Sequence, residues 1–184
     1  MRTPGFAGEV MSEVGVAVTN IPPGELYSAL ERGTIDALEW VGPALDFQMG
    51  FHQIAKYYYS GWQEPGAEVQ FLINEKTWNK LPEELQEVLR VAMRTAYDMY
   101  IQSMHESGVA WDRMKEDYPD VTHKTFPPEV IEALRDATEK LLAEEAEKDE
   151  LAREIITSQQ DYLKQVRQWT NISDKAYLNS VSGE

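Results

Sequence analysis

The pattern of hydrophobic and polar positions changes character near Pro82. Before this residue, short runs typical of strands alternate with short runs of helical period, and the connections are only a few residues long. We predict strands over residues 1–4, 16–19 and 34–38, and helices over residues 6–15 and 24–33. This alternation is typical of a mostly parallel sheet with helices on its faces. The first part of the chain is therefore predicted to be α/β.

The pattern between residues 43 and 81 is less regular. Gly42-Pro43 interrupts the chain, and a short helix is expected between residues 45 and 54. Residues 55–60 contain three consecutive tyrosines and favour a strand. Residues 67–74 alternate apolar and polar positions, which predicts a further strand after a loop over residues 61–66.

Helical period dominates after Pro82, which suits the first position of a helix. Apolar residues recur at helical spacing from Leu85 to the Met104 region, and a continuation through Met114 is left open. Tyr118-Pro119-Asp120 is expected to end this helix.

Two more helices are predicted towards the end of the chain. One begins at Pro127-Pro128, and a last long helix carries apolar residues from Leu151 to Trp169. The acidic run over residues 144–150 is interpreted as solvated surface. Beyond Asn171 the tail is polar and is predicted to be loose.

Charge and composition exclude several classes of function. The 184 residues carry a net charge of -15, which disfavours binding to nucleic acid or to an anionic membrane surface. Cysteine is absent, so neither a thiol nucleophile nor a cysteine zinc site exists. The sequence contains no apolar run long enough to span a membrane, and the residues after Met1 lack the basic and apolar regions that we expect of a signal peptide. The familiar motifs of nucleotide-binding loops and hydrolases are also absent.

Three residues near strand ends are candidates for ligand binding. Glu39-Trp40 follows the strand predicted over residues 34–38, and ligands of open α/β sheets bind outside the carboxyl ends of strands. Arg2 precedes a Pro4-Gly5 turn, and a guanidinium can hold a carboxylate with two parallel hydrogen bonds. From spacing alone, a surface arginine and a packed tryptophan beside a salt-bridged glutamate are the better interpretations.

The same residues carry a resemblance. Arg2-Thr3-Pro4-Gly5, the stretch GELYSALERGTIDALEWVGP over residues 24–43, and residues 56–62 resemble the substrate-binding proteins of tripartite ATP-independent periplasmic (TRAP) transporters. They are most similar to the branch that binds 2-oxo acids and related monocarboxylates, often with a metal ion. The resemblance extends from Met1 to roughly Gln168. It implies a periplasmic-binding-protein-like (type II) α/β lobe with a mixed sheet, followed by long C-terminal helices.

The resemblance also implies a ligand site. Arg2 would bind the substrate carboxylate, and Trp40, Phe6 and Tyr59 would line the cleft. A sodium or calcium ion would be bound by Glu39 and Trp40 together with Glu64, or with Glu68 as the alternative. Other branches of the family carry an amide residue at the Trp40 position, so Trp40 points to the metal-assisted branch. Hard cations of this kind take oxygen ligands from carboxylates and carbonyls.

Proteins of this kind are longer and carry a first α/β lobe, so we expect this chain to correspond to their C-terminal half. It would comprise a ligand-binding lobe over residues 1–66, a strand crossing between lobes over 67–81, helices packing on both lobes over 82–170, and a loose tail over 171–184. The exported parent would act in the periplasm and deliver its ligand to the membrane permease, and a homodimer is left open. The main alternative is a structural or interaction module formed by an isolated half-fold. A small α/β enzyme is the weakest of the three hypotheses.

Overall fold

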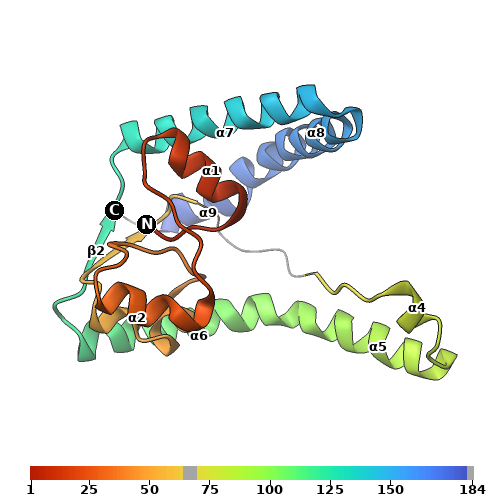
Figure 1. Cartoon of the computed structure of the whole chain (residues 1–184), viewed down its shortest axis with the longest axis horizontal. Coiled ribbons are helices and arrows are strands. Elements are labelled where there is room, and N and C mark those ends of the chain that lie inside the picture. The colour runs from red at the N-terminus through yellow and green to blue at the C-terminus, as the bar shows by residue number, and fades with distance from the viewer. Residues whose placement is uncertain (64–69, 182–184) are drawn as a thin grey trace. The chain divides into compact units, whose positions relative to one another are not determined.

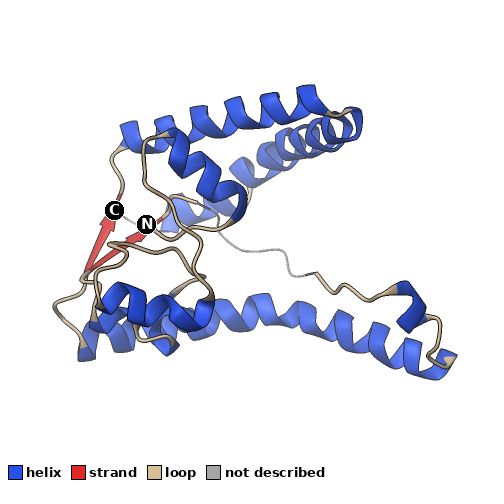
Figure 2. Cartoon of the chain, viewed as in Figure 1, coloured by secondary structure: helices blue, strands red, loops and turns tan. Residues whose placement is uncertain are grey.

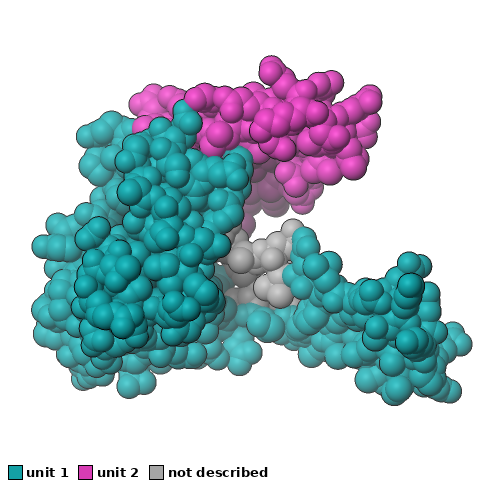
Figure 3. Space-filling model, viewed as in Figure 1, with its two compact units in different colours: residues 1–131 teal, residues 132–184 magenta. Residues whose placement is uncertain are grey.

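The computed structural model describes residues 1–63 and 70–181, apart from the side chains of Tyr97 and Tyr100. The chain divides into two compact units, Met1–Ile131 and Glu132–Glu184 (Figure 3). Each unit is described below by itself.

The first part of unit 1 consists of short helices, several of them joined by extended loops (Figures 1 and 2). Its elements, in chain order, are α1 (Gly5–Glu13), the 3-10 helix η1 (Pro23–Glu25), α2 (Leu26–Glu31), α3 (Pro43–Gln48) and η2 (Phe51–Gln53). The helices expected over residues 6–15 and 24–33 are thus present, each with slightly different ends.

The three strands predicted over residues 1–4, 16–19 and 34–38 are reduced to single bridges. Arg2 pairs in parallel with both Thr19 and Leu38. Among the described residues, neither pairing extends beyond a single bridge. The predicted strands are too long, because backbone N–H groups close to the bridges donate to carbonyls outside any strand. The N–H groups of Thr34 and Ile35 both donate to the carbonyl of Ala29 at the end of α2. The parallel order implied by the pattern is nevertheless present.

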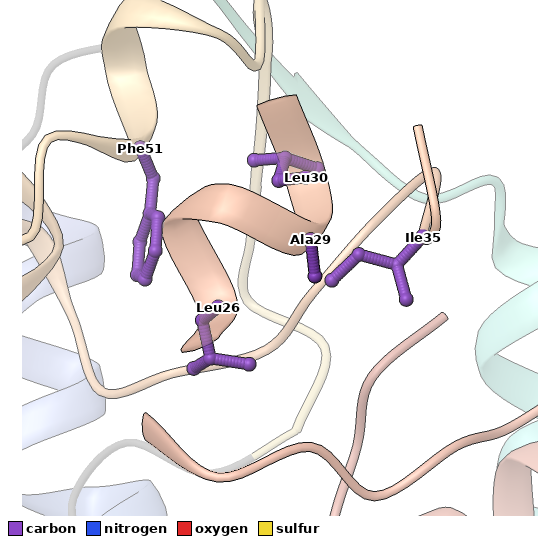
Figure 4. Packing of buried hydrophobic residues seen from close by; sticks show 5 residues of the cluster. All are labelled: Leu26, Ala29, Leu30, Ile35 and Phe51. Carbon is purple, nitrogen blue, oxygen red and sulfur yellow. The ribbon is translucent and has the colours of Figure 1, made fainter. Parts of the chain in front are cut away.

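A small apolar core holds this part of unit 1 together (Figure 4). Leu26 is 0% exposed, and it packs with residues from α2, the segment after α2 and η2: Ala29, Leu30, Ile35 and Phe51. The left-handed backbone of Gly33 (φ 68°) ends α2 and lets the chain turn towards Ile35. Trp40 and Leu38 pack against the edge of the same cluster, so the core reaches the Arg2 bridges.

A two-stranded parallel sheet forms the second centre of unit 1. Strand β1 (Tyr57–Ser60) confirms the strand expected in the tyrosine run, and it pairs with β2 (Thr122–Thr125) in the register Tyr57 to Thr122. The analysis of the sequence missed β2, although its β-branched threonines are a strand signal. A mixed sheet was expected, but the pairings among the described residues are parallel.

Aromatic side chains pack around this sheet. Phe47 stacks on the ring of His52, with 4.4 Å between ring centroids, and Tyr118 meets the His52 ring at 4.2 Å in an edge arrangement. Tyr59 stacks on Phe126 at 4.5 Å. Helix α3 also packs against α6 (Met99–Asp117), which fixes the helix beside the sheet.

The helical part of unit 1 contains α4 (Glu75–Trp78), α5 (Glu83–Thr95), the 3-10 helix η3 (Ala96–Asp98) and α6. α5 and α6 follow one another nearly in line (Figure 1), and α6 ends just before Tyr118, as predicted. The strand prediction over residues 67–74 is wrong for residues 70–74, which form no strand, and residues 67–69 lie outside the described residues. Leu72 is 90% exposed, so little of the protein packs on its side chain.

Unit 2 is formed by helices. α7 (Pro128–Lys148) begins in unit 1, and α8 (Glu150–Ile172) and α9 (Asp174–Val181) follow and contact one another. Asp149 caps α8 by accepting a hydrogen bond from the N–H of Ala152 at 2.8 Å. The loose tail predicted beyond Asn171 is wrong as far as residue 181. The chain re-forms a helix there because the N–H of Tyr177 donates to the carbonyl of Ser173 at once after α8 ends.

Candidate functional site

The candidate site is built around Arg2, which lies between two parallel backbone segments. The N–H of Arg2 donates to the carbonyl of Ala37 at 2.9 Å, and its carbonyl accepts from the N–H of Glu39 at 3.0 Å. On the other side, the carbonyl of Met1 accepts from the N–H of Thr19 at 3.0 Å. The backbone of Arg2 is therefore fixed from both sides, at the carboxyl ends of parallel segments where α/β proteins bind ligands.

The guanidinium of Arg2 is held below the surface by uncharged groups. The residue is 6% exposed. Its Nη1 donates to the carbonyl of Glu39 at 2.9 Å, its Nε lies 3.4 Å from the carbonyl of Ile21, and its Cζ is 5.5 Å from the ring centroid of Trp40. Both carbonyls belong to residues that come just after a bridge partner of Arg2. Backbone dipoles and an indole face stabilise the cation without placing a full negative charge on it.

Part of the guanidinium is available to a ligand. The hydrogen bonds recorded among the described residues use Nε and Nη1, and none of them uses Nη2. An arginine in this state is prepared to bind an anion, because an incoming carboxylate supplies the charge that carbonyls lack. Chemically, the arrangement can bind and orient a small carboxylate.

The structure brings together Arg2, Glu39 and Trp40, three of the residues that the resemblance implies for the site, and their role in binding stays a prediction. Both Glu39 and Trp40 are half-buried. The backbone carbonyl of Glu39 accepts a hydrogen bond from Nη1 of Arg2, and the carboxylate of Glu39 is a separate group. Trp40 contributes its ring to Arg2 and packs on the core cluster.

The oxygen donors near Arg2 suit a hard cation, but the described residues do not complete a metal site. Glu39 supplies one carboxylate, and the nearby backbone carbonyls are donors of the kind that sodium and calcium prefer. Among residues 1–63 and 70–181, no three histidine, aspartate or glutamate side chains gather as a metal site would require. Glu64 and Glu68, the alternative third ligands, both lie outside the described residues. Glu39 could hold a cation together with further ligands.

Phe6 and Tyr59 are not in recorded contact with Arg2 in the described part of the chain. Phe6 lies in the first turn of α1 and is 41% exposed. Tyr59 lies on β1, where it stacks on Phe126, and the edge of Trp62 meets the same phenylalanine ring. Their predicted places as lining residues stay predictions.

Sequence reasoning missed two contributors to the geometry of the site. The carbonyl of Ile21 reaches Arg2 because Pro22 and Pro23 hold the chain extended after the Thr19 bridge, a signal that proline spacing could have revealed. Thr3 is 1% exposed, and its hydroxyl oxygen finds no hydrogen-bond partner among the described residues. No sequence pattern could have indicated that.

The half-buried carboxylate of Asp46 has a structural role. Asp46 accepts from the hydroxyl of Tyr58 at 2.8 Å and from the N–H groups of Val41 and Gly42 at the start of α3. Burial raises the pKa of Asp46, and this effect outweighs the opposite effect of the hydrogen bonds. Burial also raises the pKa of Tyr58, and the neighbouring charge of Asp46 adds to this rise. The pair ties α3 to β1.

The fold and the site together describe an α/β unit with a buried cationic side chain at the carboxyl ends of parallel segments. The chain belongs to the family described as DctP, bacterial extracellular solute-binding protein, family 7, whose model matches residues 1–149. Members of this family are extracytoplasmic solute-binding proteins, which confirms the family that the resemblance indicated.

Three relatives illustrate the match. A monocarboxylate 2-oxoacid-binding periplasmic protein of Nostoc sp. is 36% identical over 184 residues, which are 99% of this chain and 50% of the relative. A TRAP periplasmic solute-binding protein from Colwellia psychrerythraea, with bound calcium and pyruvate, is 58% identical with a TM-score of 0.93, over 98% of this chain and 55% of that one. One from Pseudoalteromonas atlantica, with bound sodium and pyruvate, is 57% identical with a TM-score of 0.92 at the same coverage.

These matches confirm the predicted fold class, since the chain superimposes almost completely on TRAP solute-binding proteins. The chain spans about half the length of the relatives that it matches. Among the described residues, no helix combines the length and apolar character needed to cross a membrane.

Proposed function

We propose that this chain provides a ligand-binding lobe of a TRAP-type solute-binding protein that captures a 2-oxo acid such as pyruvate. The observation that carries the proposal is the buried guanidinium of Arg2, held by the carbonyls of Glu39 and Ile21 beside the ring of Trp40. A carboxylate would supply the negative charge at this cation. Calcium or sodium, the ions found with pyruvate in two relatives, would bridge Glu39 and the ligand.

In this proposal the protein transports rather than converts its ligand. It would act outside the cytoplasm, closing on the acid and delivering it to the membrane permease subunits of the transporter. Closure would follow from the ligand's better contacts in the closed state, which shift an open and closed equilibrium. The chain spans about half the length of its relatives, so, tested by itself, it offers the ligand fewer groups than they do, and we expect weak, millimolar binding to the isolated chain.

The first test compares Arg2→Lys with Arg32→Lys. Lysine keeps the charge of Arg2 and loses the paired donors, so pyruvate affinity should fall at least about tenfold. Arg32 is exposed at the end of α2, and its substitution should leave affinity unchanged. Chemical-shift titration in calcium buffer, carried to pyruvate concentrations well above the dissociation constant of the wild type, measures both variants. Equal affinity in the wild type and Arg2→Lys would refute the placement of the carboxylate, and sub-micromolar binding would refute the need for further groups.

The second test addresses the cation through Glu39→Gln, with Glu31→Gln on the exposed end of α2 as control. Mass action requires a bound ligand to raise the melting temperature. Wild type and control should show a pyruvate-induced rise that is larger with calcium than with chelator, and Glu39→Gln should lose this difference. A calcium effect that survives in Glu39→Gln would exclude this carboxylate as a ligand.

An interaction module is the second candidate function, and the surface of α5 is the observation that favours it. Leu85, Val88 and Val91 lie on this helix and are each at least half exposed. Such a face could associate with another protein or with a second copy of this chain. Light scattering over a range of concentrations would separate the functions, since a monomer at all concentrations would count against self-association.

A further inference from the structure

Helix α1 approaches the segment that carries Arg2 more closely than a side chain would allow. A Cβ atom placed on Gly8 would lie 2.6 Å from the carbonyl oxygen of Thr3 and 3.3 Å from Cγ1 of Val18. The first distance is far inside van der Waals contact. Gly8 is buried and lies in the regular part of α1, where any residue could adopt its backbone angles. Glycine is therefore required here for space and not for conformation.

The carbonyl of Thr3 has little freedom to move away. Thr3 is 1% exposed and precedes Pro4, whose ring restricts the backbone of the residue before it. On its other side is Arg2, whose N–H and carbonyl both take part in backbone hydrogen bonds to Ala37 and Glu39. An added methyl group at residue 8 must therefore displace α1, Thr3 or the Arg2 peptide.

We propose that Gly8 is a positioning residue for ligand binding, because its missing side chain sets the depth at which Thr3 and Arg2 lie. This inference rests on the proposed function in that Arg2 is taken as the carboxylate-binding group. Two parallel hydrogen bonds to a carboxylate tolerate a misplacement of only about 0.5 Å. A shift of the Arg2 backbone would also disturb the contacts of the guanidinium with Glu39 and Trp40.

The test substitutes Gly8→Ala and uses Gly24→Ala as a matched control. Gly24 lies in η1 of the same unit, has an ordinary backbone, and offers open space to an added Cβ. We expect Gly8→Ala to weaken pyruvate binding in calcium buffer by about tenfold or more, and Gly24→Ala to stay within about twofold of the wild type. Affinity of Gly8→Ala equal to that of the control would overturn the proposal.

A direct readout of Arg2 separates this inference from the proposed function. The NMR signals of the Arg2 Nε–H group and the Trp40 indole N–H should shift in ligand-free Gly8→Ala and stay in place in Gly24→Ala. If the wild type binds no carboxylate, the proposed function fails while these signals still decide whether Gly8 positions Arg2. Unchanged Arg2 and Trp40 signals in Gly8→Ala would refute positioning whatever the binding result.

A double variant identifies the contact responsible. Val18→Ala removes the side chain near Gly8 but leaves the Thr3 carbonyl, which belongs to the backbone. The Arg2 signals and the affinity should therefore remain displaced in Gly8→Ala with Val18→Ala, and recovery of either would assign the effect to crowding of Val18. If Gly8→Ala is unfolded in buffer, trimethylamine oxide favours the compact state, and all variants are compared in it.

Discussion

Helices α2 and α5 have similar amphipathic patterns but very different surroundings. On α2, Leu26 is 0% exposed and Leu30 is 7% exposed, because η2 and the segment around Ile35 close over them. On α5, no residue is buried, and Leu85 remains 50% exposed. The comparison teaches that the period of apolar residues tells which face of a helix can be buried. It does not tell whether anything lies against that face.

The largest expected difference between the two helices comes from the same truncation made in each. Leu26→Ala should lower the free energy of unfolding by about 3 kcal/mol, since it removes a fully buried side chain and leaves a cavity. Leu85→Ala should cost no more than about 1 kcal/mol, because half of the side chain is already in water. Urea unfolding followed by tryptophan fluorescence measures both. Equal losses of unfolding free energy in the two variants would contradict the difference between the helices and indicate that α5 is covered in solution.

The buried His52 and the exposed His105 extend the comparison to the pH dependence of stability. His52 is 6% exposed, and neither ring nitrogen has a hydrogen-bond partner among the described residues. Burial, together with the nearby charge of Lys56, lowers the pKa of His52 below its usual value of 6.5. Above pH 6.5 the ring is neutral in both the folded and the unfolded chain, so His52 adds no pH dependence to the free energy of unfolding there.

As pH falls through 6.5, the unfolded chain gains a proton at residue 52 that the folded chain resists. The free energy of unfolding should then fall, by at most about 1.4 kcal/mol per pH unit from this residue. Denaturation between pH 7.5 and 5.5, about one unit either side of the histidine value, should show a flatter dependence for His52→Phe. His105→Phe, on the exposed surface of α6, serves as control. The same profile for His52→Phe and wild type would contradict a neutral buried ring.

The smallest effect is expected from a glycine in the exposed helices. An added Cβ on Gly108 of α6 meets nothing within 4 Å. Gly108→Ala should therefore raise the stability of α6 by about 0.5 to 1 kcal/mol through helix propensity. Thermal unfolding followed by circular dichroism measures this change. The same substitution at Gly8 should destabilise, so two effects of the same sign would contradict the close packing of α1.

Much of this fold could be predicted because the signals are local. Proline, glycine and apolar period place α1, α2 and the end of α6 within a few residues. β2 was missed, because its exposed threonines gain order only from pairing with β1, 65 residues earlier in the chain. The strands around Arg2 were overestimated, because local pattern does not reveal which N–H groups other carbonyls take.

The candidate site was predicted through resemblance more than through physics. Spacing alone favoured a surface location for Arg2, whereas the structure buries it beside Glu39 and Trp40. The contacts that hold it come from carbonyls of Ile21 and Glu39, and a carbonyl has no signature in the sequence. Glu64 and Glu68 lie outside the described residues, so the choice between them stays a prediction.

The bridges of Arg2 to Thr19 and Leu38 have a consequence for the order of folding. Helices form from local contacts, whereas the surroundings of the guanidinium require three chain segments to meet, and these are separated in sequence by α1 and by η1 with α2. During refolding, the helical circular dichroism signal should therefore recover before the contacts around the Arg2 guanidinium have formed. Competence to bind a carboxylate would then report completion of the entire segment from residue 1 to residue 40, and an incompletely folded chain would carry no ligand.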